Sequence, residues 1–366
     1  MTDHPAAAAP RAVASVDDAM AHAVELATRG PSWGPNPRVG CVLLAPSAAG
    51  APERTVLAEG WHRGAGTPHA EAAALAAARE AGVDVRGATA VVTLEPCNHT
   101  GRTGPCAVAL EQAGVAEVVY AVADPNPVAA GGAEHLASRG VRTELRPTSA
   151  ATELTHAWAT AAAAGRPYVI LKTATTLDGR VAAADGSSRW ITGPEARTHA
   201  HEVRATVDAI AVGTGTVAAD DPALTARRPG GGLAAHQPLR VVVGRRDVPP
   251  AARLRTEEGG ALVHLATHDV TEVLAALAAR EVRTLLVEGG PRLATAFLDA
   301  GVVDELHAYV APVLLGAGRG AVGDLGVTTL ADAPRWRTHD VRRLGDDVLL
   351  TARTHPSPSR PTAQEA

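Results

Sequence analysis

The chain has 366 residues, 46% of them hydrophobic, with three Cys and a formal net charge of −5. This length suits two domains. Three cysteines are too few for a disulfide framework, so we expect a reducing, cytoplasmic location. No Lys/Arg stripe is visible and aromatic residues make up 2% of the chain, which argues against a nucleic-acid partner. Neither a membrane span nor a secretory signal is predicted, because charges interrupt the apolar runs and the alanine-rich N-terminus lacks a basic start.

The first half of the chain alternates helical and strand patterns, and no structure is predicted before about residue 14. Helical patterns cover residues 16–30, 69–82 and 133–140, and each ends at a glycine. Strand patterns cover residues 39–45, 89–96, 117–127 and 141–146. This alternation predicts a largely parallel sheet with helices on both faces.

An alanine-rich, helical connector is predicted from about residue 150 to 165, and a second series of strands follows it. Strands are predicted over 168–179, 207–217, 239–249, 261–267, 283–291, 305–316 and 346–354, with helices at 271–282 and 291–301. We therefore expect an N-terminal domain over 14–155 and a C-terminal domain over 156–354. The Pro/Ser-rich tail, 355–366, is predicted to be disordered.

His69, Cys97 and Cys106 form a candidate metal site in the first half. Two thiolates and one imidazole are a natural zinc environment, and a catalytic zinc keeps its fourth position open. Glu71, two residues after His69, is then a base beside the metal, as in the H-x-E…P-C-x-x-C signature of zinc deaminases. Two alternatives remain at this point: a pair of core cysteines beside a chance His-Ala-Glu, or a closed structural zinc site completed by His62 or His99.

The segments "TLEPCNHTGRTGPC" and "GPNPRVGCVLL" resemble the deaminase half of the bacterial bifunctional riboflavin-biosynthesis enzymes. In that family a diaminohydroxyphosphoribosylaminopyrimidine deaminase is joined to a 5-amino-6-(5-phosphoribosylamino)uracil reductase. Among zinc deaminases, the long spacer between the two cysteines is specific to this family. The resemblance implies one Zn²⁺ per chain on His69, Cys97 and Cys106, with Glu71 moving protons. It also implies that the pyrimidine is held by Asn36 and His62, and that the ribose phosphate lies near Asn98, His99, Thr100 and Arg102. Cys41 is expected to be a core residue.

The second half contains two strand–glycine–helix turns, at Gly213–Gly215 and at Gly289–Gly290. Backbone amides at such helix starts can receive a phosphate, although neither turn has the full G-x-G-x-x-G pattern. The segments "LKTATTLDGRVA", "SSRWITGPEAR", "GTGTVAADDPALTAR" and "LLVEGGP" resemble the reductase half of the same family, whose fold is like that of dihydrofolate reductase. The expected fold is thus a three-layer, cytidine-deaminase-like zinc domain followed by a dihydrofolate-reductase-like α/β domain.

The resemblance assigns residues to the reductase site. The residues expected to bind NADPH are Ala174, Trp190, Thr216, Asp220, Gly290, Pro291, Arg292, Leu293, Ala294, Thr295 and Ala296. The residues expected to bind substrate are Ser188, Arg204, Leu224, Arg227 and Glu288. Lys172, the only lysine in the chain, is expected to be catalytic. Because guanidinium groups match phosphate geometry, we also hypothesise that Arg245, with its neighbour Arg246, binds the 2′-phosphate of NADPH; the alternative is an exposed basic turn.

The function implied is riboflavin biosynthesis by a homo-oligomer. Zinc-dependent deamination of 2,5-diamino-6-(5-phosphoribosylamino)pyrimidin-4-one would precede NADPH-dependent reduction of the ribosyl chain to a ribityl chain. One alternative is a single-function zinc deaminase of nucleobases with a C-terminal binding domain. The other is a non-catalytic, zinc-stabilised scaffold, which requires four protein ligands.

Overall fold

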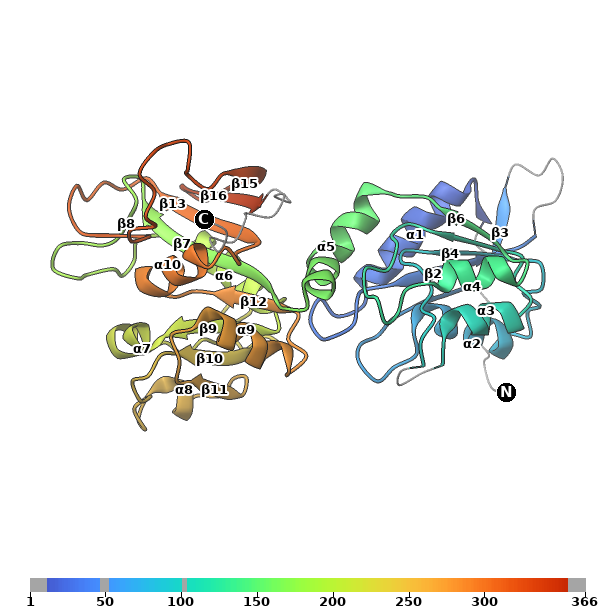
Figure 1. The fold of residues 1–366 in the computed structure, drawn as a ribbon, viewed down its shortest axis with the longest axis horizontal. Helices are drawn as coiled ribbons and strands as arrows, with labels where there is room; N and C mark the ends of the chain where they lie inside the picture. Colours follow the sequence, from blue (N-terminus) through green and yellow to red (C-terminus); the bar gives the residue numbers. More distant parts are fainter. Residues whose placement is uncertain (1–11, 47–52, 101–103, 355–366) are drawn as a thin grey trace, which may run out of the picture. The chain divides into compact units, whose positions relative to one another are not determined.

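The computed structural model describes residues 12–46, 53–100 and 104–354 (Figure 1). The chain divides into two compact units, residues 1–165 and 166–366. The predicted disordered tail, 355–366, lies outside the described residues. No helix in the described part of the chain is long and apolar enough to cross a membrane.

The first unit is built on a six-stranded sheet in the order β1-β3-β2-β4-β5-β6. Its strands are β1 (Ala12–Val13), β2 (Gly40–Leu44), β3 (Arg54–Trp61), β4 (Thr89–Val92), β5 (Glu117–Tyr120) and β6 (Arg142–Leu145). Only the pairs β4-β5 and β5-β6 are parallel; the pairs β1-β3, β2-β3 and β2-β4 are antiparallel.

The prediction of a largely parallel first sheet is therefore wrong. The sequence patterns did not predict β3, because its segment "RTVLAEGW" mixes charged with apolar residues. They did not predict β1 either, which begins before residue 14. β3 starts ten residues after the end of β2, and a connection this short between neighbouring strands favours antiparallel pairing.

Helices cover both faces of this sheet, as predicted (Figure 1). These helices are α1 (Val16–Thr28), α2 (Ala70–Glu80), α3 (Cys106–Gln112), α4 (Gly132–Ser138) and α5 (Ser149–Ala164). Along β2, Cys41 and Leu43 pack in one core with residues of α2, α3 and α4, whereas Val42 and Leu44 pack in another with residues of α1 and α5. This alternation follows from the two-residue period of a strand, and it confirms the three-layer architecture.

The helix α5 confirms the predicted helical connector, but it belongs to the first unit. Thr155 and Ala161 on α5 are buried, and Trp158 Nε1 donates a hydrogen bond to the carbonyl oxygen of Pro35 at 3.1 Å. The helix ends at Gly165, which has a left-handed φ of 64°. The division therefore falls between residues 165 and 166, and the expected boundary at residue 155 lies inside α5.

The second unit contains an eight-stranded sheet in the order β11-β10-β9-β12-β7-β13-β16-β15. Its strands are β7 (Tyr168–Thr176), β9 (Ala209–Gly213), β10 (Leu239–Val243), β11 (Leu262–Leu265), β12 (Thr284–Val287), β13 (Glu305–Ala311), β15 (Trp336–Leu344) and β16 (Asp347–Thr354). The pairs from β11 to β13 are parallel, and β16 and β15 add an antiparallel edge. A separate small sheet pairs β8 (Arg180–Ala182) with β14 (Arg319–Gly320).

The helices of the second unit are α6 (Pro194–Arg204), α7 (Thr214–Asp220), α8 (Arg253–Thr256), α9 (Val270–Ala278) and α10 (Pro291–Asp299). Its largest core joins buried residues of β7, β9, β10 and β12 to α9 and α10. Because β9, β10 and β12 are parallel, the turns after these strands lie at one edge of the sheet. In open α/β sheets, that edge is where ligands bind.

A chain ending at residue 155 should be less stable than one ending at residue 165, because it loses the half of α5 that carries Trp158 and Ala161. We expect its unfolding temperature to be lower by at least about 5 °C. Thermal unfolding of the two fragments, followed by circular dichroism, measures the difference. Equal unfolding temperatures would show that the second half of α5 contributes nothing to the first unit.

Candidate active sites

The first site is a cluster of His69, Cys97 and Cys106, whose ligand atoms all lie within 4.8 Å of one another. His69 is the N-cap residue of α2, and Cys106 is the first residue of α3. Cys97 lies in the loop after β4. The His69 Nδ1 atom is 3.5 Å from Cys97 Sγ and 3.4 Å from Cys106 Sγ. The sequence prediction that these three side chains converge is confirmed.

The chemistry of this donor set fits zinc. Both thiols are buried and neither forms a disulfide. Hydrogen bonds from Cys106 and His69 lower the pKa of Cys97 to about 4 despite its burial, and the hydrogen bond with Cys97 raises the pKa of His69. A thiolate is thus favoured in the cluster, and thiolate is the form that binds metal. Two sulfur ligands and one imidazole leave the fourth position of a tetrahedral site open.

Glu71 is buried in the first turn of α2, beside the cluster and not part of it. Burial raises the pKa of its carboxyl group to about 7. A carboxyl group with this pKa can both accept and release a proton near neutral pH. The position and the pKa suit the general acid–base role predicted for Glu71.

Asn36 and His62 lie next to this cluster. The Asn36 amide donates a hydrogen bond to His62 Nε2 at 3.0 Å, and His62 Nδ1 donates to the carbonyl oxygen of Pro68 at 3.1 Å. The imidazole rings of His62 and His69 are perpendicular, with centroids 5.5 Å apart. Because both ring nitrogens of His62 have protein partners, His62 is not available as a fourth metal ligand.

The spacer between the two cysteines is only partly described. Asn98 is exposed, and its backbone N–H donates to the carbonyl oxygen of Ala129. His99 is outside the metal cluster, and its buried Nδ1 atom has no hydrogen-bond partner. Thr100 is exposed, and Arg102 lies outside the described residues. Within the described residues, therefore, no fourth protein ligand closes the site.

Cys41 is fully buried on β2 and packs in the core under α2. Burial raises the pKa of its thiol well above the ordinary value. The expectation that Cys41 is a core residue is confirmed.

The second site is centred on Glu288, which directly follows β12. Arg204, the last residue of α6, donates from Nε and Nη2 to the two Glu288 carboxylate oxygens, each at 2.7 Å. Lys172 Nζ, on β7, is 3.8 Å from Glu288 Oε2 and 5.5 Å from the ring centroid of Tyr309. Although burial opposes ionisation of Glu288, the charges of Arg204 and Lys172 lower its pKa to about 2. Burial lowers the pKa of Lys172.

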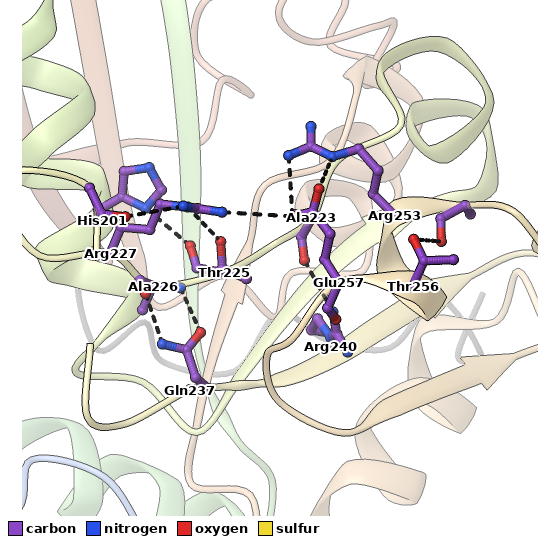
Figure 2. Close-up of polar contacts among 12 residues, drawn as sticks. His201, Ala223, Thr225, Ala226, Arg227, Gln237, Arg240, Arg253, Thr256 and Glu257 are labelled. Carbon is purple, nitrogen blue, oxygen red and sulfur yellow. Dashed lines mark hydrogen bonds and ion pairs between the residues drawn. The ribbon is translucent and has the colours of Figure 1, made fainter. Parts of the chain in front are cut away.

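The loop that carries the predicted residues Leu224 and Arg227 is fixed by hydrogen bonds, as Figure 2 shows for its polar members. The carbonyl oxygen of Thr225 accepts from His201 Nδ1 at 3.0 Å and from Arg204 Nη1 at 3.1 Å. Arg227 Nε donates to Thr225 Oγ1. Leu224 is buried with a left-handed φ of 53°. The structure thus brings Lys172, Arg204, Glu288 and this loop together.

The predicted cofactor residues lie mainly on the turns after β9 and β12. The Gly290 N–H donates to Thr216 Oγ1 at 3.1 Å, which joins the two turns. A Cβ atom on Gly289 would lie 2.7 Å from Leu293 Cβ, so this turn requires glycine. Ala294 is buried on α10, and Thr295 Oγ1 donates to the carbonyl oxygen of Pro291.

The remaining residues predicted to bind NADPH or substrate lie outside these two turns. Ala174 pairs with Tyr309 across β7 and β13, and the Asp220 carbonyl oxygen accepts from Arg189. Trp190 is 70% exposed. Ser188 is half-buried, and Arg245 and Arg246 are exposed after β10.

Sequence reasoning overlooked two residues of the second site, His201 and Tyr309. His201 could have been found from its spacing, because it lies three residues before Arg204 on one helix and side chains so spaced share a face. Tyr309 had no such local signal, since its contact with Lys172 depends on the pairing of β13 with β7.

The fold and the two sites define a bifunctional enzyme: a zinc-binding deaminase domain joined to an α/β reductase domain. Residues 14–122 match the cytidine and deoxycytidylate deaminase zinc-binding region, and residues 167–350 match the RibD C-terminal domain. The chain belongs to the RibD family of riboflavin-biosynthesis deaminase/reductases.

Relatives match almost the whole chain. The riboflavin biosynthesis protein RibD of Mycobacterium tuberculosis strain H37Rv is 47% identical, covering 93% of this chain and 97% of its own. RibD of Escherichia coli K12 is 40% identical, covering 90% and 97%. The solved structure of the Thermotoga maritima deaminase/reductase has a TM-score of 0.80 and 32% identity, covering 93% of this chain and 99% of that chain.

The solved structure of Acinetobacter baumannii RibD, form 2, has a TM-score of 0.79 and 36% identity, and covers 92% of this chain and 98% of that chain. Because the bifunctional relatives match both halves of the chain, the alternatives of a nucleobase deaminase with an unrelated binding domain and of a non-catalytic scaffold are wrong.

Replacing Cys106 with Ala should remove most of the bound zinc, because it leaves two ligands where a stable site needs at least three. Replacing the other buried cysteine, Cys41, with Ala is the matched control and should leave zinc bound. Metal content of the purified proteins by mass spectrometry measures both. Full zinc occupancy in C106A would contradict the ligand set.

Proposed function

We propose that this chain catalyses two consecutive steps of riboflavin biosynthesis. The first unit hydrolytically deaminates 2,5-diamino-6-(5-phosphoribosylamino)pyrimidin-4-one at a single zinc ion, and the second unit uses NADPH to reduce the ribosyl chain of the product to a ribityl chain. The observation that carries the proposal is the convergence of His69, Cys97 and Cys106 beside the buried Glu71. The solved structure of the Thermotoga maritima relative is described as a deaminase and reductase of these phosphoribosylaminopyrimidines, which supports the choice of substrate.

In the deaminase site, zinc held by His69, Cys97 and Cys106 supplies the Lewis acidity that hydrolysis needs. Glu71 takes the proton of the attacking water and returns it to the departing amine, which leaves as ammonia. Asn36 and His62 hold the pyrimidine. The hydrogen bond between them uses one Asn36 N–H and fixes the amide orientation, so that its oxygen and second N–H can meet the pyrimidine edge.

Replacing Glu71 with Gln should abolish deamination, because an amide of the same shape cannot carry the proton. We expect ammonia release to fall by at least about a hundredfold. Zinc content should stay unchanged, and reduction of pre-deaminated substrate should continue. Ammonia release near the wild-type rate would contradict the role of Glu71.

In the reductase site, NADPH supplies the hydride and Lys172 interacts with the sugar oxygen as the ribose ring opens. At 3.8 Å the Lys172 ammonium is too far from Glu288 for a hydrogen bond, so its N–H groups can donate to substrate. Burial destabilises this ammonium and favours donation of a proton to the ring oxygen. Arg204 donates from Nε and Nη2 to Glu288, and its assignment to the substrate site stays a prediction.

Replacing Lys172 with Arg should reduce hydride transfer by at least about tenfold, or ~1.4 kcal/mol of barrier. The guanidinium is larger and planar, and it does not release a proton. Oxidation of NADPH, followed by its absorbance, measures the rate, and deaminase activity serves as the control. Reductase turnover within about twofold of wild type would mean that this lysine has no special role.

The preference for NADPH is assigned to Arg245 and Arg246. They are exposed directly after β10, and the parallel neighbour β9 leads into the turn that carries Thr216. Within the described residues neither arginine has a hydrogen-bond or ion-pair partner, so both can bind a phosphate.

Replacing both Arg245 and Arg246 with Ala should raise the KM for NADPH about tenfold or more, because charge-assisted hydrogen bonds contribute ~1.5–3 kcal/mol. The KM for NADH, which lacks the 2′-phosphate, is the control and should change little. An unchanged ratio of the two KM values would contradict the assignment. Cytoplasmic location and a homo-oligomeric state stay predictions.

A further inference from the structure

His201 has a fixed orientation in the second unit, and one of its ring nitrogens is already used. It lies on the same face of α6 as Arg204, and it donates to the carbonyl oxygen of Thr225 (Figure 2). Arg204 donates to the same oxygen. A carbonyl oxygen can only accept hydrogen bonds, so His201 Nδ1 carries the hydrogen of this contact. The Thr225 contact therefore determines which way the imidazole ring faces.

The second ring nitrogen, Nε2, has no protein partner within the described residues. Burial and the neighbouring charge of Arg204 lower the pKa of His201, so the ring is neutral near pH 7. In a neutral ring whose hydrogen is on Nδ1, Nε2 is a hydrogen-bond acceptor. His201 thus offers an uncommitted acceptor at a fixed position.

The surroundings of His201 are rich in donors. The charges of Arg204, Glu288 and Arg227 all act on its imidazole, which places the ring among these predicted substrate residues. Both Glu288 carboxylate oxygens already accept hydrogen bonds from Arg204, while Lys172 and Arg227 are cationic donors. Cations suit the phosphate of a sugar phosphate, but its hydroxyl groups are also donors and need an acceptor.

We propose that His201 is a specificity-determining residue of the reductase site, whose Nε2 accepts a hydrogen bond from a ribose hydroxyl group of the substrate. The proposal deepens the reductase function proposed above and rests on it. The Thr225 contact holds the acceptor in place before substrate binds. A substrate that lacks this hydroxyl group would leave the nitrogen unpaired and would be selected against.

Two conservative variants separate the two ring nitrogens. In His201→Asn, the side-chain amide nitrogen can replace Nδ1 as donor to Thr225, but the Nε2 acceptor is lost. In His201→Gln, the longer amide can replace the acceptor, but the donor to Thr225 is lost. Both variants are made in the full chain. Each is assayed with NADPH on the 5-amino-6-(5-phosphoribosylamino)uracil substrate and on its 2′-deoxy and 3′-deoxy analogues.

We expect the wild-type enzyme to lose at least about fivefold in kcat/KM on one of the two deoxy analogues, the scale of one hydrogen bond. In H201N this penalty should fall to within about twofold, because the acceptor is already absent, whereas in H201Q it should persist. Deaminase activity and the unfolding temperature show that each variant is folded. If H201N does not fold, His201→Ala takes its place in the same comparison.

A wild-type enzyme that shows no penalty on either analogue, or an H201N variant that keeps the full penalty, would overturn the proposal. A purely structural His201 would lower activity equally on all three substrates, which also overturns it. If the wild-type chain reduces none of them with NADPH, the proposed reductase function itself fails, and that outcome is distinct from a failure of the His201 assignment.

Discussion

The Glu288 carboxylate is a buried negative charge at the end of a buried parallel strand. The second site is arranged around the groups that balance this charge. Its side chain is 7% exposed, and such a charge is tolerated only when it is paired and hydrogen-bonded. Arg204 satisfies both oxygens and at the same time donates to Thr225. One guanidinium therefore connects α6, the end of β12 and the loop before β10. Breaking a buried pair of this kind typically destabilises a protein by about 3–5 kcal/mol.

Each domain has a buried glutamate in its site, but the pKa values of the two glutamates are shifted in opposite directions. Burial raises the pKa of Glu71 to about 7, whereas Glu288, although also buried, has its pKa lowered to about 2 by Arg204 and Lys172. Glu71 can therefore exchange a proton, while Glu288 keeps a permanent charge that orients cations. The same side chain thus serves acid–base chemistry in one unit and positioning in the other, because burial outweighs the charge of His69 at Glu71, whereas Arg204 and Lys172 outweigh burial at Glu288.

Local signals predicted the first site better than the second. His69, Cys97 and Cys106 lie within one segment that has an unusual spacer, and His69 and Cys106 lie at helix starts, so the spacing alone indicated the cluster. The Arg204–Glu288 pair joins residues 84 positions apart, and no local sequence pattern predicts it. The same limit applies to the first sheet. Its antiparallel pairs depend on β3, whose mixed composition gave no clear strand signal.

In both units a site residue directly follows an interior strand of the sheet or lies in the loop after it. In the first unit, β4 pairs antiparallel with β2 and parallel with β5, and Cys97 lies in the loop directly after it. In the second unit, β12 lies between β9 and β7, which are not its neighbours in sequence, and Glu288 directly follows it. The sheet supplies a comparable position in each unit, and the side chains gathered there decide the chemistry: thiolates and an imidazole in one, and a paired carboxylate with a lysine in the other.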